Sequence, residues 1–595
     1  MLLDLDHLPP EAESFDIVVI GAGGAGMSAA LVAAIDGARV LLVEHTGYVG
    51  GTTAYSGGTT WIPGTSHAAT VSRGDTLDRA AAYLARAIGN HSPADLRRRM
   101  LETGPEAVAY IEANSEVKYR ACPYHPDYLS ELEDSTVSGR ALEPLPFDGR
   151  KLGNLFSLIR PPIPEFTVLG GMMVDRTDIR HLLGMKKSPA SFLHAARILA
   201  RHLSDRLRHP RGTRLVMGNA LVARLLFSLS QRRNASLMLN TSVEQIHQDA
   251  DGVNAVTLVR HGRRRTVAVK GGVILASGGF NRDPALRKQL LPGVDPAWCP
   301  GAPGHTGAVH ALARDLGAHY GTGAMSHAFW APVSLRRRRD GSTAVFPHFV
   351  MDRGKPGMMT VNQAGQRFVN ETTSYHLFGI AMQQAHRRSP AIPAYLIADA
   401  QALSKYGMGM VRPGGKGLAP FIAEGYLTEA ATLAELAARL GMEPRALEES
   451  VARFNAYAAS GQDDDFQRGL GAYQRNLGDP AWPGANPAMG PLRHGPFYAV
   501  RLYPGDIGAA TGFATDAYAR VLDAADHPVP GLYAVGNDMQ SAMGGVYTGP
   551  GITLGPGLVF GYIAARHAAR RAAQGRAPAG SGMAATRASA GVAAS

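Results

Sequence analysis

The sequence predicts an α/β fold in which a Rossmann-type domain is interrupted by an inserted α+β domain. Residues 15–20, FDIVVI, form a short apolar run that breaks into the glycine-rich turn GAGGAG and continues as the Ala-rich stretch MSAALVAAIDG. A second apolar run, ARVLLVE, ends on Glu44. Two further apolar runs, VILASGGFN at 273–281 and GLYAVGN at 531–537, come much later. Such alternation of strand and helix signals predicts a parallel sheet, here built from both ends of the chain.

The glycine-rich turn predicts a dinucleotide site, because it lies between a strand and a helix. Gly21 permits the tight turn, Gly23 lets the backbone approach a pyrophosphate, and Gly26 allows the helix to pack closely on the strand. The helix N-terminus supplies free N–H groups and partial positive charge. Glu44 stands 18 residues after Gly26, where its carboxylate can accept hydrogen bonds from an adenosine ribose.

The later glycine-rich loops favour FAD over NAD. GGTTAYSGG at 50–58 adds a second loop that a site for NAD alone would not need, and GPGITLGPGLVFGYIAARHA at 549–568 runs from a glycine loop into a helix. A dinucleotide as long as FAD needs contacts from several distant segments, and the last helix N-terminus would face the flavin pyrimidine. The TTAYSGG loop has no histidine, so we expect non-covalent FAD. The residues expected to contact it are Gly21, Gly23, Gly24, Ala25, Gly26, Glu44, His45, Gly50, Gly51, Thr52, Thr53, Ser56, Gly57, Gly58, Val243, Ala276, Ser277, Gly278, Gly536, Asn537, Gly551, Thr553 and Leu554.

These segments predict a discontinuous, glutathione-reductase-like FAD-binding domain over 1–320 and 492–575. A substrate-binding or cap domain of α+β type is expected at 321–491. The last residues, 576–595, are Ala-, Gly- and Ser-rich without apolar periodicity, so we expect a disordered tail.

Composition excludes several classes of protein. The 595 residues include 45% hydrophobic residues, 18% charged residues and 70 glycines, as in a globular, loop-rich enzyme. The two cysteines, Cys122 and Cys299, have no cluster spacing, so disulfides, iron–sulfur clusters, haem and other metal sites are not expected. The net charge of +11 comes without aromatic interleaving or a nucleic-acid motif, so we expect no nucleic-acid partner. The acidic start and the lack of a long apolar run predict a soluble cytoplasmic protein.

A basic helical segment stands out between Arg180 and Arg214, where nine Lys/Arg accompany one acid, Asp205. An apolar stripe recurs there at helical spacing, made of Phe192, Ala196, Leu199, Leu203 and Leu207. Two interpretations remain open. The helix packs on the body with a solvated basic face, or it lies on an anionic membrane surface, which would suit a lipophilic substrate.

Several longer stretches resemble the FAD-dependent dehydrogenases related to 3-ketosteroid Δ1-dehydrogenase, within the fumarate reductase flavoprotein superfamily. The similarity runs over nearly all of residues 15–570. Its most diagnostic stretches are GGTTAYSGGTTWIPG, YHPDY with PLPFDGRKLG, RFVNETTSYHLFG, ARFNAYAASGQDDDFQRG, GPFYAVRLYPGDIG and GNDMQSAMGGVYTGPGITLGP.

The resemblance implies desaturation of a 3-ketosteroid, with a hydride leaving C1 for flavin N5 and a proton leaving C2 for a tyrosine. It implies Tyr375 as the base, Tyr128 as its hydrogen-bonding partner, and the Tyr547 hydroxyl with the Gly551 N–H as the clamp on the C3 carbonyl oxygen. These residue types suit the chemistry. Two donors stabilise the developing enolate oxygen. A tyrosine is a poor base at neutral pH, so we expect a second, donating tyrosine to lower its pKa.

Other activities remain as alternatives, because the surroundings depart from the family pattern. Ala510 replaces a lysine and Ala308 an acid that the family commonly has. A Δ4-(5α) dehydrogenase or the desaturase of another bulky cyclic ketone would use related residues. A fumarate reductase is disfavoured, because Tyr375 stands where those enzymes have an arginine proton donor. A flavoprotein electron carrier without a substrate pocket would have no use for the NETTSYHLFG segment. No motif identifies the electron acceptor. A quinone at the membrane surface suits the basic segment, and oxygen or a protein partner are the alternatives.

Overall fold

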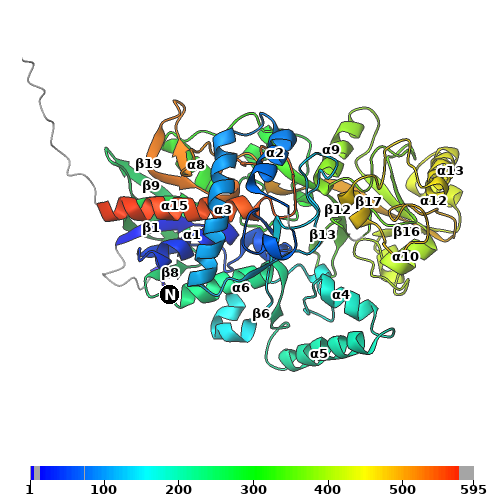
Figure 1. The fold of residues 1–595 in the computed structure, drawn as a ribbon, viewed down its shortest axis with the longest axis horizontal. Helices are drawn as coiled ribbons and strands as arrows, with labels where there is room; N and C mark the ends of the chain where they lie inside the picture. Colours follow the sequence, from blue (N-terminus) through cyan, green and yellow to red (C-terminus); the bar gives the residue numbers. More distant parts are fainter. Residues whose placement is uncertain (1, 6–13, 73, 351, 575–595) are drawn as a thin grey trace, which may run out of the picture.

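The parallel sheet predicted from the glycine-rich turn lies in the left half of Figure 1, where β1, β8 and β19 are labelled. The computed structural model describes residues 2–5, 14–72, 74–350 and 352–574, so the predicted tail at 576–595 lies outside the described residues. The parallel strands run in the order β8-β2-β1-β11-β19, and antiparallel neighbours complete eight strands. They are β1 (Ser14–Ile20), β2 (Val40–Val43), β8 (Ala235–Met238), β9 (Ser242–Asp249), β10 (Gly252–Arg260), β11 (Arg263–Leu275), β18 (Arg520–Leu522) and β19 (Pro528–Ala534).

Two helices from opposite ends of the chain cover this sheet side by side. The first, α1 (Gly24–Ile35), is short and rich in small residues, and the last, α15 (Leu554–Gln574), lies directly on it (Figure 1). Gly561 permits this approach, because an added Cβ would lie 3.1 Å from the Ala25 carbonyl oxygen. Close packing of this kind buries backbone against backbone. The Rossmann-type α/β fold is therefore confirmed, with strands and helices contributed by both ends of the chain.

The second large sheet is antiparallel and belongs to the inserted α+β region, with strands in the order β13-β12-β17-β15-β14 and β16 beside β17. Both faces are covered. Ala394, Leu396 and Ala398 face one core, whereas Tyr395 and Ile397 face the other, as the two-residue period of a strand requires. The strands are β12 (Ala328–Arg337), β13 (Thr343–Pro347), β14 (Met358–Val361), β15 (Ala394–Ala398), β16 (Leu427–Ala430) and β17 (Phe497–Ala509).

Strand β17 lies beyond the predicted 491/492 boundary, yet it pairs with β12 and β15 of the inserted sheet. The predicted boundary thus separates β17 from the other strands of its sheet, and the domain limits stay a prediction.

The helices around the inserted sheet are α9 (Tyr375–His386), α10 (Ala400–Tyr406), α11 (Ala419–Ala423), α12 (Leu433–Leu440), α13 (Pro444–Ser460) and α14 (Ala472–Leu477). The remaining elements are α2 (Leu77–Ile88), α3 (Ala94–Asn114), α4 (Arg176–Leu183), α5 (Pro189–Arg206), α6 (Met217–Ser230), α7 (Pro284–Leu290), α8 (Ala308–Asp315), β3 (Thr60–Trp61), β4 (Tyr119–Ala121), β5 (Ala141–Pro144), β6 (Phe147–Asp148) and β7 (Arg214–Leu215).

The basic segment folds into α4 and α5, which lie at the lower edge of Figure 1. Helix α5 packs through a different face from the predicted stripe, burying Ala195, Ile198, His202 and Asp205. Three members of the stripe instead face solvent, with exposed fractions of 59% for Phe192, 67% for Leu203 and 85% for Leu207. Within the described residues, no helix combines the length and apolar character needed to cross a bilayer.

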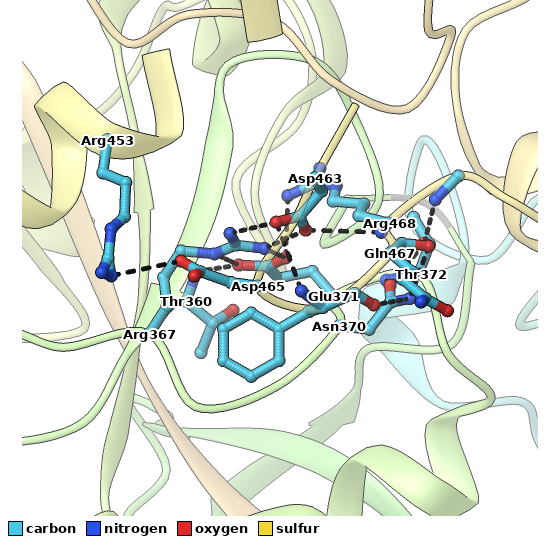
Figure 2. Close-up of polar contacts among 12 residues, drawn as sticks. Thr360, Arg367, Asn370, Glu371, Thr372, Arg453, Asp463, Asp465, Gln467 and Arg468 are labelled. Atoms are coloured by element: carbon cyan, nitrogen blue, oxygen red, sulfur yellow. Dashed lines mark hydrogen bonds and ion pairs between the residues drawn. The ribbon is translucent and has the colours of Figure 1, made fainter. Parts of the chain in front are cut away.

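A buried ion network holds the loop that leads from β14 into α9 (Figure 2). Arg367 donates to the carboxylates of both Glu371 and Asp463, and Glu371 also pairs with Arg468 at 3.1 Å. Burial disfavours the charged carboxylate of Glu371, but the two arginines outweigh it and hold the pKa of Glu371 below its usual range. The loop just before Tyr375 is thereby tied to the 463–468 segment.

Replacing Glu371 by Gln should destabilise the protein by about 3–5 kcal/mol, because two buried guanidinium groups then share one carboxylate. Chemical denaturation at pH 7 of the FAD-loaded protein measures this. The depressed pKa makes the Glu371 contribution complete above about pH 4.3 and lost as the pH falls further. The wild-type and variant stabilities should therefore converge in acid.

The matched control is Glu449→Gln on α13, where an exposed carboxylate pairs with Arg445. This exposed pair should contribute little to stability, because solvent screens it. Equal effects of the two substitutions would contradict the anchoring role of Glu371.

Candidate active site

One cavity is lined at one end by the glycine-rich loops and at the other by tyrosines from distant segments. Its wall includes Ile20 of β1 and Val43 of β2 from the parallel sheet, and Phe329 of β12 and Ile507 of β17 from the antiparallel sheet. A ligand in this cavity would therefore touch both large sheets.

The turn after β1 has the backbone that a pyrophosphate site needs. Gly21 has a φ of +109°, and a Cβ there would lie 2.2 Å from the Ala276 carbonyl oxygen, so only glycine is accommodated. A Cβ on Gly23 would meet nothing within 4 Å, which leaves open space beside the turn. Helix α1 begins without a capping side chain on Gly23, so its first turn can donate N–H groups to an anion.

The carboxylate of Glu44 is fixed by the surrounding chain. Its Oε2 accepts from the Ala22 N–H at 3.0 Å, and its Oε1 accepts from the Thr46 hydroxyl at 2.7 Å. Glu44 is buried and lines the cavity, so its remaining acceptor capacity can meet a ribose hydroxyl. Together with the turn, this donor and acceptor set fits FAD.

Nearly all of the residues predicted to contact FAD line the cavity. Their contact with FAD itself stays a prediction. The exceptions are Gly26 and Gly50, which shape the turn instead. A Cβ on Gly26 would lie 2.0 Å from the Gly21 carbonyl oxygen. Gly50 has a φ of +109° and donates to the Ala22 carbonyl.

Sequence reasoning missed a further lining segment at 300–309. Thr52 connects it to the second glycine loop, because its hydroxyl accepts from the Ala302 N–H at 2.9 Å and lies 3.2 Å from the His305 ring. Burial lowers the pKa of His305 to about 4, so its ring is neutral. The Gly- and Pro-rich sequence PGAPGHTGA was the available signal, but it lacks the preceding strand by which the other loops were found.

At the other end of the cavity, the structure brings together the tyrosines singled out in the sequence. The Tyr128 and Tyr375 hydroxyls are 3.2 Å apart. The Tyr547 ring centroid lies 4.9 Å from that of Tyr375 and 5.5 Å from that of Tyr128. Gly551 lines the same cavity, and its N–H has no hydrogen-bond partner in the part of the chain that the structure describes.

Gly551 is restricted to glycine by its backbone. It has a φ of +92°, and an added Cβ would lie 2.3 Å from the Thr59 carbonyl oxygen. Its own carbonyl accepts from the Trp61 N–H at 3.1 Å. The loop therefore keeps the Gly551 N–H available at the cavity, close to the start of α15.

The segment that holds Tyr128 is fixed by buried polar contacts. The Tyr128 N–H donates to the Thr548 carbonyl at 2.9 Å, which joins it to the loop containing Tyr547. The neighbouring Asp127 accepts from Trp61 Nε1 and from Arg140, a buried arginine that also binds Asp75. Tyr375 is the first residue of α9, and Ser374 caps this helix by accepting from the Leu377 N–H.

Burial governs the electrostatics of the phenols. It raises the pKa of Tyr375 and of Tyr128 well above 10, and the neighbouring phenols add to this effect. The expectation that Tyr128 lowers the pKa of Tyr375 is therefore not met, since the hydrogen bond raises the pKa of Tyr375 and lowers that of Tyr128. The ionised form of this pair is consequently scarce at neutral pH and strongly basic.

Sequence reasoning also missed Tyr473 of α14, whose ring lies 4.5 Å from that of Tyr128. Burial raises the pKa of Tyr473 to about 12, although the nearby Arg353 lowers it. Arg353 is itself buried and donates to four backbone carbonyls, those of His348, Phe349, Glu371 and Thr373. No local motif marks Tyr473, because only the fold brings it to the pair.

Comparison with known proteins agrees with this geometry. The FAD binding domain family matches residues 16–554. A 3-oxosteroid 1-dehydrogenase of Mycolicibacterium smegmatis is 35% identical over 578 residues, covering 95% of this chain and 99% of the relative. A 4-oxocyclohex-2-ene-1-carboxylate 5-dehydrogenase of Sinomonas cyclohexanicum is 36% identical over 562 residues, covering 94% of each.

A solved structure is similar over the same range. The 3-ketosteroid Δ1-dehydrogenase of Sterolibacterium denitrificans, in complex with 1,4-androstadiene-3,17-dione, has a TM-score of 0.87 and 35% identity, covering 94% of this chain and 100% of that one. With its glycine-rich turn, its cavity and this similarity along nearly the whole chain, the protein belongs to the 3-ketosteroid Δ1-dehydrogenase family of FAD-binding oxidoreductases.

Proposed function

We propose that the protein is an FAD-dependent dehydrogenase that introduces a C=C bond between C1 and C2 of a 3-ketosteroid. The observation that supports this most is the meeting of the Tyr128–Tyr375 pair with Tyr547 and the Gly551 N–H at one end of the cavity whose other end has the glycine-rich loops. When bound, FAD supplies a hydride acceptor for C1 of the substrate.

The protein's own groups hold the ketone and remove the proton. The Tyr547 hydroxyl and the Gly551 N–H donate to the C3 carbonyl oxygen and stabilise the negative charge that develops on it as the C2 proton leaves. Loss of one such donor typically costs about 3–4 kcal/mol of transition-state stabilisation. The C2 proton passes to the oxygen of Tyr375, while Tyr128 shares the charge through its hydrogen bond.

The ionisation state of the pair follows from its burial. One of the two phenols must lose a proton before Tyr375 can accept one, and burial makes this loss costly. The apolar side chains of Phe329 and Phe349 beside the tyrosines limit solvation of the resulting base.

A second candidate is desaturation of a smaller cyclic ketone. The Sinomonas cyclohexanicum relative, named for a 4-oxocyclohexenecarboxylate, is as similar to this chain as the steroid enzyme. The tyrosines and Gly551 bind only the ketone and its neighbouring carbons, so they serve either ring system. A Δ4-(5α) dehydrogenase would need the same groups with the steroid shifted in the cavity.

An anaerobic screen separates these candidates. The FAD-loaded enzyme is mixed with 3-keto-4-ene steroids, 5α-3-ketosteroids and 4-oxocyclohexanecarboxylate, and bleaching of the flavin absorbance is followed. We expect 3-keto-4-ene steroids to reduce the flavin and to yield the 1,2-unsaturated product. Bleaching by the cyclohexane ketone alone would favour the second candidate, and no bleaching by any ketone would exclude both.

Replacing Tyr375 by Phe should lower kcat at least 100-fold, because the proton acceptor is removed. Tyr128→Phe should have a smaller effect of about 10-fold or more, because the charge on Tyr375 is then no longer shared. Retained FAD and an unchanged steroid difference spectrum are the controls for folding and binding. Normal turnover by Tyr375→Phe would remove this residue as the base.

The raised pKa also predicts the pH dependence. Because the active form has lost a phenolic proton and its pKa lies above 10, kcat/KM of the wild type should increase about tenfold per pH unit through pH 7–9. A stopped-flow pH profile of flavin reduction measures this. A flat profile would contradict an ionising tyrosine pair.

We propose further that the α4–α5 unit rests on an anionic membrane surface, where a quinone could accept the electrons. Besides the exposed stripe on α5, Leu183 and Leu193 have exposed fractions of 63% and 70%. Exposed basic side chains, including Lys186, Lys187 and Arg206, lie among them. Apolar and cationic groups on one projecting unit suit the interface of an anionic bilayer.

Sedimentation with phosphatidylglycerol vesicles tests this surface. The wild type should bind them, bind phosphatidylcholine vesicles less, and be released by salt. The double variant Leu203→Ser with Leu207→Ser should reduce the bound fraction at least fivefold. Leu470→Ser, which alters a leucine that is 65% exposed elsewhere, is the matched control. Equal binding by both variants would exclude this surface.

A further inference from the structure

We propose that the natural substrate is a cyclic ketone bearing a carboxylate, and that Arg176 binds this carboxylate at the rim of the cavity. The inference rests on the proposed function, which assigns the ketone to Tyr547 and Gly551. It concerns the part of the substrate that lies away from the ketone, and the residues of the same cavity that recognise it.

Arg176 is an exposed residue at the start of α4 that also lines the cavity. Its guanidinium donates to His125 Nε2 at 3.4 Å. Across the described residues, this is its only side-chain hydrogen bond, and no carboxylate lies within ion-pair distance of it. An arginine with this much unused donor capacity is suited to a bidentate carboxylate ligand.

The acids nearest to Arg176 in the sequence are paired with other cations. Asp175 and Asp178 both pair with Arg214, and Asp178 also contacts His194. Glu165, at the other side of this segment, forms a pair with Arg338 at 2.8 Å. The positive charge of Arg176 is thus not neutralised by its own surroundings.

His125 lies beside Arg176 and positions its guanidinium. Burial and the Arg176 charge lower the pKa of His125 to about 3, so the ring is neutral. Because Nε2 accepts from Arg176, the ring proton lies on Nδ1. This Nδ1 is buried and has no partner among the described residues. His125 therefore holds the Arg176 guanidinium at the wall as a neutral acceptor, and the remaining N–H groups of that guanidinium have no protein acceptor among the described residues.

The remaining wall at this end is apolar, with Ile163, Phe166, Phe349 and Val350. These side chains can hold an alicyclic ring skeleton. Arg160 also lines the cavity, but it donates to the Thr46 hydroxyl next to Glu44 and stacks on Tyr48, at the nucleotide end. Arg176 instead contacts His125, away from the nucleotide end of the wall.

Matched substrate pairs test the inference. Each pair contains a keto acid and its methyl ester: a 3-oxo-4-ene steroid 17β-carboxylate, a steroid with a longer side-chain acid, and 4-oxocyclohexanecarboxylate. For at least one pair, kcat/KM of the wild type should be fivefold or more higher for the acid. Arg176→Gln should abolish this preference through KM while changing kcat/KM for the esters less than twofold, and Arg176→Lys should restore part of it.

Arg180→Gln, on the same helix and also exposed, is the matched control and should leave all values unchanged. Flavin difference spectra give Kd for acids and esters independently of turnover. Equal Kd values for acid and ester in every pair would overturn the inference, even if neutral steroids are desaturated as proposed. A uniform loss of kcat with all substrates in Arg176→Gln would also overturn it, because Arg176 would then act on the tyrosine pair. Failure of every ketone to reduce the flavin would instead contradict the proposed function.

Discussion

The arrangement of the active site depends on a backbone hydrogen bond between two segments from opposite ends of the chain. The Tyr128 N–H donates to the Thr548 carbonyl, and the same oxygen accepts from the buried Tyr83 hydroxyl at 2.6 Å. Thr548 lies between Tyr547 and Gly551, the proposed clamp on the ketone, and Leu554 begins the helix that closes the FAD domain. One buried carbonyl thus fixes Tyr128 relative to the loop that contains Tyr547 and Gly551, and leaving it unpaired would cost about 1–3 kcal/mol.

Burial has opposite effects on stability and on catalysis in this cluster. Four phenols, of Tyr128, Tyr375, Tyr473 and Tyr547, pack together and exclude water, which raises the pKa of each. Their neutral forms stabilise the fold, whereas the proposed reaction needs one of them charged. Arg353, which is buried and whose guanidinium donates to backbone carbonyl oxygens, introduces a positive charge near Tyr473 that lessens this conflict.

The parts of the fold that the sequence could predict are those encoded locally. The strand, turn and helix around Gly21 and Gly26 require glycine for steric reasons that act within a few residues, so the pattern identifies them. The outward orientation of Leu203 and Leu207 was not predictable, because a stripe at helical spacing has the same pattern whether it faces a core or solvent. The sheet that β17 joins, and the approach of Tyr473 to Tyr128, follow from contacts between distant segments. The tyrosine positions were inferred from resemblance, and no periodicity would have found them.

The two ends of the cavity differ in how strongly the chain constrains them. The proposed ketone end contains Tyr128, Tyr547 and Gly551, which are joined by buried backbone hydrogen bonds and left-handed glycine geometry, so changes to the backbone there disturb the fold. Phe166 and Arg176, by contrast, lie where the chain leads into the projecting α4–α5 unit, which makes few buried contacts of its own. Changes in that unit can alter what the cavity admits without moving the groups that act on the ketone. Two relatives of similar identity to this chain are named for substrates as different in size as a steroid and a cyclohexene carboxylate.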